Sequence, residues 1–103
     1  MALPHLTPEQ RAEALKKATR ARRRRAEVKS ALKAKKMTLS EVLALAEKDE
    51  AVAKMRVVSL LESLPRVGVN TAAALMEEHK IALSRRVRGL GPVQREALVK
   101  RFN

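Results

Sequence analysis

The residues best placed to do chemistry lie in one short stretch, SRRVRGLG, at positions 84–91. It holds three arginines and two glycines, namely Arg85, Arg86, Arg88, Gly89 and Gly91. Guanidinium groups present N–H forks that match the oxygens of a phosphate, and glycines allow the backbone to approach a ligand closely and to adopt positive φ. The stretch therefore predicts a phosphate clamp. The alternative is a loop that needs glycine for its geometry and carries arginine by chance.

A second candidate is the stretch LPRVGVNTA at positions 64–72. We expect Leu64 and Val67 to face a helical core, Gly68 to permit a tight return, and Asn70 or Thr71 to cap the helix that follows. Backbone N–H groups at that helix start would then point outward and form a site for an anion. The alternative is a turn that only joins two packed helices. The candidate contact residues are Arg66, Gly68, Asn70 and Thr71.

A third candidate is the arginine run RARRRRAEVK at positions 20–29. Between Arg11 and Lys36 the only acidic residues are Glu13 and Glu27, so a helix here repels itself by about a few tenths of a kcal/mol per like-charged pair. A polyanion would relieve that repulsion. A solvated helix face or a disordered basic tail is the alternative, and an anionic membrane is disfavoured because the run lacks a bulky apolar face. The candidate contacts are Arg20, Arg22, Arg23, Arg24 and Lys29.

The charge of the whole chain points the same way as these stretches. The 103 residues include 23 Lys and Arg against 11 Asp and Glu, which gives a net charge of +12 and a pI near 11.2. A pI above about 9 with clustered basic residues is typical of nucleic-acid binding. Net charge is +9 over residues 1–36, −2 over 37–64 and +5 over 65–103. This distribution predicts two polyanion-binding surfaces on one body, which would permit one molecule to bridge two duplexes.

The sequence offers little to other classes of function. The two histidines, His5 and His79, do not form a metal-spacing pair, and no hydrolase, metalloprotease or P-loop motif occurs. The chain has no cysteine and no apolar run near the roughly 20 residues that span a bilayer. The N-terminal MALPHLTPEQR does not have the pattern of a signal peptide. We expect a cytoplasmic protein without enzymatic activity, metal, cofactor, small-molecule ligand or membrane contact.

The elements that must position these residues are predicted to be helices. Aromatic residues make up 1% of the chain, with three Gly and four Pro, while Leu, Val, Ala and Met supply the apolar positions. Capping boxes at Thr7 and Thr38 start helices, the first of which could run to about Lys35. Asp49 is expected to cap a third helix, and Ser84 a short helical turn. The predicted division is a basic helical arm at 1–35 and a compact helical body at 36–103.

Two details of this prediction concern packing. The stretch at 20–25 carries charge on every side, so we expect it to project into solvent as an arm while Val28 and Leu32 dock on the body. We also expect Leu83 and Val93 to face the core.

The motifs together resemble a known family. LPRVG followed by A and LM is similar to the helix–hairpin–helix signature, and with RRVRGLG it resembles the helix–two-turn–helix region of a small-subunit ribosomal protein. Taken end to end, the chain resembles the actinobacterial type of integration host factor. The matching pieces are MALPHLTPEQR, the basic first helix, KMRVVSLLESLPRVG and SRRVRGLG. The chain departs from the usual hairpin at Arg66, where Gly is common, and at Val69, where Lys is frequent.

The resemblance implies an all-α nucleoid-associated protein, expected as a monomer. It would bind double-stranded DNA through the phosphate backbone with little sequence preference, bend or compact it, and assist phage integrase. The lack of aromatic stacking platforms favours duplex over single strands or RNA loops. Two alternatives stay open: a structured-RNA or ribosomal binding protein with the same hairpin, and an interaction module whose basic arm docks an acidic protein.

Overall fold

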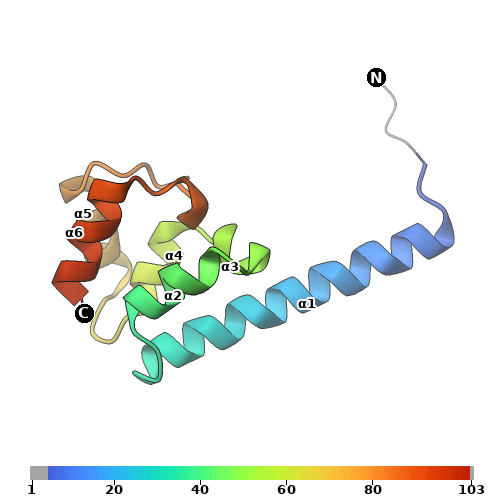
Figure 1. Cartoon of the computed structure of the whole chain (residues 1–103), viewed down its shortest axis with the longest axis horizontal. Coiled ribbons are helices and arrows are strands. Elements are labelled where there is room, and N and C mark those ends of the chain that lie inside the picture. The colour runs from blue at the N-terminus through green and yellow to red at the C-terminus, as the bar shows by residue number, and fades with distance from the viewer. Residues whose placement is uncertain (1–4, 103) are drawn as a thin grey trace.

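The computed structural model describes residues 5–102; Met1–Pro4, which open the MALPHLTPEQR stretch, and Asn103 lie outside the described residues. The described residues contain helices joined by short turns and no named strand (Figure 1). The elements are α1 Pro8–Lys33, α2 Leu39–Ala46, α3 Glu50–Ala53, α4 Val57–Glu62, α5 Val69–Glu78, the 3-10 helix η1 Val87–Gly89, and α6 Pro92–Phe102. The all-α prediction is confirmed. Over the part of the chain that the structure describes, no helix is both long and apolar enough to cross a membrane.

The helix starts follow local capping, as the sequence predicts. Thr7 Oγ1 accepts from the Gln10 N–H at 3.1 Å, and Gln10 Oε1 accepts from the Thr7 N–H at 2.9 Å. Thr38 and Glu41 make the same reciprocal pair at the start of α2. Asp49 caps α3 through the N–H groups of the first turn. Each cap accepts hydrogen bonds from backbone N–H groups that a helix start leaves unpaired. Because the capping residues are close in sequence, these helix starts can be predicted from it.

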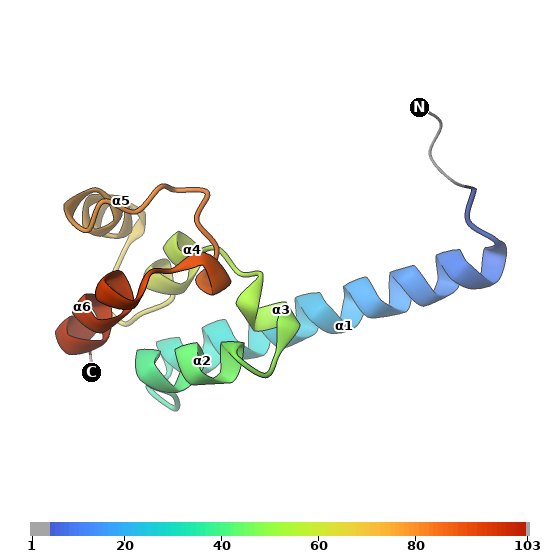
Figure 2. The same ribbon diagram turned by 45° about the horizontal axis from the view of Figure 1, so that its top comes forward.

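One half of helix α1 projects from the body and the other half packs against it. Its N-terminal half projects away from the other helices in both views, while its C-terminal half lies against α2 and α3 (Figures 1 and 2). Val28 and Leu32 are buried, as predicted. The expectation that 20–25 projects freely is wrong in part, because Arg24 and Arg25 are half-buried and α1 packs beside α3. Charge on every side of a helix does not prevent docking where the partner helix supplies a carboxylate.

The core lies between α2, α3, α4, α5 and α6, with the end of α1 closing one side. Two predicted core residues are wrong: Leu83 is 58% exposed and Val93 is 80% exposed. Ile81 and Leu98 are buried. Val93 and Leu98 stand five residues apart, about 140° around a helix, so they cannot share one face. Leu83 lies in a turn just ahead of Arg85, where backbone pairing fixes the chain.

Two helices end in the same motif without glycine. After α1, the Lys36 N–H donates to Ala31 O at 2.8 Å and the Lys35 N–H to Leu32 O at 3.1 Å, with Lys35 at φ 61°. After α5, Lys80 takes the equivalent place at φ 56°. This is the Schellman arrangement, in which glycine usually occupies the left-handed position. His79 is the C-cap of α5.

Candidate nucleic-acid interface

The arginine loop is fixed to the body by backbone hydrogen bonds. The Val57 N–H donates to Arg85 O at 3.0 Å, and the Val87 N–H donates to Met55 O at 2.8 Å. These two bonds form an isolated antiparallel bridge between Arg56 and Arg86. Val87, between the arginines, is buried in the core. The loop is therefore a fixed platform and not a loose connection.

The local geometry of the loop differs from the prediction. Ser84 does not cap a helix, since the 3-10 helix η1 begins at Val87 after extended Arg86. Neither Gly89 nor Gly91 has positive φ. Glycine at position 89 instead leaves room for the Arg85 side chain, because a Cβ there would lie 3.2 Å from Arg85 Cδ. Arg85 Nη1 donates to Gly89 O at 2.6 Å, so the missing side chain lets the arginine lie across the turn.

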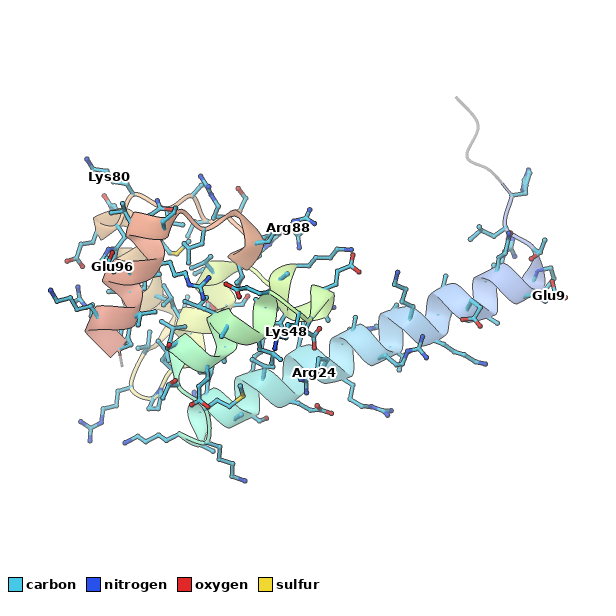
Figure 3. All side chains as sticks on the ribbon, viewed as in Figure 1. Glu9, Arg24, Lys48, Lys80, Arg88 and Glu96 are labelled. Atoms are coloured by element: carbon cyan, nitrogen blue, oxygen red, sulfur yellow. The ribbon has the colours of Figure 1, made fainter. Side chains whose placement is uncertain are left out.

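All three arginines of the loop keep donors facing solvent. Arg85, Arg86 and Arg88 are exposed. Arg86 Nη1 donates to Lys54 O at 2.6 Å, which holds its guanidinium in place and leaves other N–H groups free. Arg88 points outward from the body above α3 (Figure 3), and it makes no hydrogen bond or ion pair within residues 5–102. Exposed guanidiniums, two of them held by hydrogen bonds to backbone carbonyls, suit phosphate oxygens.

The hairpin between α4 and α5 turns at a different residue from the one predicted. Arg66 adopts φ 66°, in the left-handed region, whereas Gly68 is extended at φ −92° and ψ −179°. Leu64 and Val67 are buried, as predicted. Gly68 is the N-cap of α5, so the prediction that Asn70 or Thr71 caps this helix is wrong. Both residues lie inside its first turn because the chain enters the helix earlier.

The start of α5 has no side-chain cap. Gly68 cannot supply one, and the structure shows no side-chain hydrogen bond there. Arg66 and residues 68–71 are exposed. Unpaired N–H groups at a helix start, next to an exposed arginine, favour an anion. The predicted hairpin contacts thus lie together on one surface.

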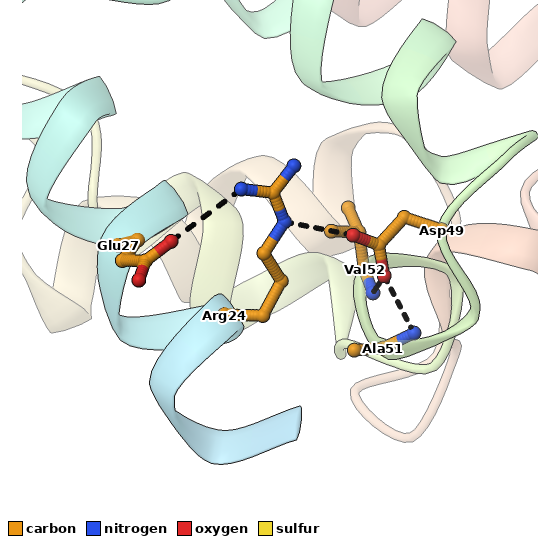
Figure 4. A network of polar contacts seen from close by, with 5 residues as sticks. All are labelled: Arg24, Glu27, Asp49, Ala51 and Val52. Carbon is orange, nitrogen blue, oxygen red and sulfur yellow. Dashed lines mark hydrogen bonds and ion pairs between the residues drawn. The ribbon is translucent and has the colours of Figure 1, made fainter. Parts of the chain in front are cut away.

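Of the predicted arm contacts, Arg24 is already engaged. Its Nε donates to Asp49 Oδ2 at 2.7 Å, and its Nη1 lies 3.4 Å from Glu27 Oε2 (Figure 4). The hydrogen bond to Arg24 holds the pKa of Asp49 below its ordinary value, and the bond to Asp49 raises the pKa of Arg24. Arg20, Arg22, Arg23 and Lys29 are exposed and have no hydrogen bond or ion pair within the described residues.

Other cations are also neutralised by acids. Lys54 pairs with Glu50 at 2.8 Å, and the pKa of Glu50 is lowered first by that hydrogen bond and then by the charges of Lys54, Lys17 and Arg88. Arg95 pairs with Glu47, and Arg101 with Glu78. Sequence reasoning missed Arg56, which lies directly opposite Arg86. No local signal links two residues thirty positions apart. Among the described residues no cluster of His, Asp and Glu could hold a metal.

Comparison with known families and proteins gives a consistent result. Residues 32–102 match the family described as S13-like H2TH domain. The chain is 54% identical to the integration host factor of Mycolicibacterium smegmatis over 103 residues, covering 100% of this chain and 98% of that protein. It is 55% identical to the integration host factor of Mycobacterium tuberculosis over 102 residues, covering 99% of this chain and 97% of that protein. The integration host factor of Streptomyces coelicolor is 53% identical over 102 residues, with 99% and 95% covered.

One solved structure shares the fold closely. It is a structure of sIHF bound to an 8-bp palindromic DNA, and it superimposes with a TM-score of 0.83 at 46% identity. The match covers 85% of this chain and 99% of that chain. At this identity the likeness extends beyond fold to the residues themselves.

Proposed function

Because the chain belongs to the integration host factor family, we propose that it binds double-stranded DNA through the phosphate backbone with little sequence preference. The observation that carries the proposal is the likeness to sIHF, which was solved bound to an 8-bp palindromic DNA. The exposed arginines of this chain are consistent with that role, since guanidiniums neutralise phosphates and release counterions.

Two surfaces of the body support backbone binding. The loop presents Arg85, Arg86 and Arg88 beside Gly89 and Gly91, fixed by the pairing with residues 55–57. The hairpin presents Arg66 and the uncapped start of α5 at Gly68–Thr71. Neither surface carries an aromatic residue on which a base could stack, which favours duplex over single strands.

The remaining parts of the function follow from the family and the charge. We propose that residues 1–35 act as a basic arm and residues 36–103 as the DNA-binding body. The protein would act without an enzymatic step, bending or compacting DNA as a monomer in the cytoplasmic nucleoid. The name shared by the relatives favours a role beside a phage integrase in site-specific integration.

Binding across a salt series tests the proposal. If about six phosphates are covered, log K against log salt should have a slope near roughly −5 for a random-sequence DNA duplex. Replacing Arg85, Arg86 and Arg88 by Ala should flatten that slope by up to about 3. Lys100→Ala is the control, because Lys100 is exposed on α6 and has no partner within the described residues. A triple variant with the wild-type slope would remove the loop from the contact surface.

A matched RNA duplex in the same series separates the alternatives. Equal or tighter binding to RNA would favour the structured-RNA function, since A-form duplexes are recognised by shape and by the 2′-hydroxyl. A shallow slope with both duplexes, and binding to an acidic protein that depends on residues 1–27, would favour the interaction module.

A further inference from the structure

A small basic hollow lies where α1, the α3–α4 connection and the arginine loop meet. Its volume is about 220 Å³. Its polar lining consists of Arg25, Lys29, Lys54, Arg56, Ser59 and Arg86. Among the described residues, no acidic side chain lines it. We call this hollow the junction pocket.

The fold brings these cations together from separate segments. Arg25 and Lys29 are four residues apart on α1 and so share one face of that helix. Arg56 and Arg86 lie opposite each other in the antiparallel bridge and form a non-hydrogen-bonded pair. In such a pair the Cα atoms approach to about 4.5 Å and the side chains lie close together. The hydrogen bond to Lys54 O fixes Arg86 at the same place.

Three of the cations in the junction pocket have no acidic partner among the described residues. The side chains of Arg25, Lys29 and Arg56 have no hydrogen bond or ion pair within residues 5–102. The neighbouring residue Arg24 is paired with Asp49, and the ammonium group of Lys54 is paired with Glu50. Like charges opposite each other across a bridge are destabilising. The fold therefore keeps one group of unpaired cations together, although the neighbouring cations Arg24 and Lys54 are paired with acids.

The geometry points to a bound phosphate group. We propose that the junction pocket holds one phosphate of the DNA backbone, gripped jointly by Arg25 and Arg56, with Lys29, Arg86 and the Ser59 hydroxyl around it. This inference rests on the proposed function. If it holds, the arm and the arginine loop form one continuous DNA-binding site. The charge distribution along the sequence instead predicts two separate surfaces.

Joint grip of one phosphate has a distinct signature in the salt dependence of duplex binding. Arg25→Gln and Arg56→Gln should each flatten the slope of log K against log salt by about 1 and weaken binding about tenfold at 0.1 M salt. The double variant should also flatten the slope by about 1 and lose about tenfold, because the same counterion release is removed once. Lys100→Gln is the matched control. Thermal melting of each variant checks that it is folded. We expect folded variants, because neither side chain makes a hydrogen bond or ion pair within the described residues.

Three results would overturn the inference. Slopes equal to wild type in all variants would place no phosphate in the pocket. A double variant flattened by about 2 and weakened about a hundredfold would show two separate phosphates. The third result would come from calorimetry with inorganic phosphate at constant ionic strength. If the wild-type chain binds phosphate saturably, and the double variant loses this binding but keeps its affinity for duplex DNA, the pocket would be assigned to a free phosphate compound. Absence of duplex binding by the wild-type chain would instead refute the proposed function.

Discussion

At the scale of single residues, Arg66 combines a strained backbone with a candidate DNA contact. Its φ of 66° lies in the region that side chains with a Cβ disfavour. The side chain is exposed and stands before the uncapped start of α5. The family resemblance places glycine at this position in most hairpins. The arginine therefore adds a charge to the surface while it makes the turn less favourable.

Two substitutions at Arg66 separate these effects. We expect Arg66→Gly to be more stable than Arg66→Ala by about 0.5–1 kcal/mol, after the larger chain entropy of glycine is subtracted. Chemical denaturation measures this difference. Both variants remove the cation, so both should flatten the salt slope of duplex binding by about 1 if Arg66 contacts a phosphate. Equal stability of the two variants would contradict the left-handed turn.

At the scale of elements, an ion pair joins the long helix to the body. Asp49 caps α3 and also accepts from Arg24 of α1 (Figure 4). The Asp49 side chain is 23% exposed and the Glu27 side chain 57%, so the Asp49 pair is the less solvated of the two. One side chain thus starts α3 and links it to α1.

Substitutions at Asp49 separate capping from the ion pair. Asp49→Asn keeps an acceptor for the Ala51 N–H and should cost less than about 1 kcal/mol; Asp49→Ala also removes the cap and should cost about 1 kcal/mol more. The pKa of Asp49 is lowered in the folded protein, so the pair stabilises the fold above the ordinary pKa of about 3.9. That stabilisation is lost as the pH falls below this value. Melting across pH should show the gap between wild type and Asp49→Asn closing below about pH 4; a gap independent of pH would exclude the ion pair.

The elements also show what the sequence can predict. Helix starts at Thr7, Thr38 and Asp49 follow from caps that act within four residues, so they were predictable. The left-handed residues Lys35, Arg66 and Lys80 were not, because the usual marker, glycine, is absent at all three.

For the candidate site, residue types and clustering predicted the arginine loop and the hairpin as surfaces. The pairs Arg24–Asp49 and Arg56–Arg86 were not predictable, because they join residues 25 and 30 positions apart. Such contacts depend on packing between elements, which a local pattern does not carry. The half-buried position of Arg25 had one signal: Ala14, Ala18, Ala21 and Val28 recur at helical spacing, which places residue 25 on the same face of the helix.

At the scale of the whole molecule, charge is distributed along an elongated shape. The Cα atoms extend over 47 × 33 × 25 Å, with the projecting half of α1 along the longest direction (Figures 1 and 2). The arm carries Arg20, Arg22 and Arg23 beyond the Arg24–Asp49 pair, and the body carries the loop and the hairpin. The junction pocket is lined by Arg25 of α1 and Arg86 of the arginine loop, so a duplex bound over it would lie beside both the arm and that loop.

The length of the duplex tests whether arm and body bind the same DNA. Arg11, Lys16 and Lys17 lie 8 to 14 residues before Arg25 on α1, which at about 1.5 Å per residue is about 12–21 Å, or about 4–6 base pairs at about 3.4 Å per step. Replacing these three exposed residues by Gln should therefore leave binding to a duplex of about 8 base pairs that is centred on the body nearly unchanged. The same variant should weaken binding to a duplex of about 25 base pairs at least tenfold and flatten its salt slope by up to about 3. Fluorescence titration with both lengths measures this. Equal losses at both lengths would place the arm on the same few base pairs as the body, and no loss at either length would exclude the arm from the duplex that the body binds.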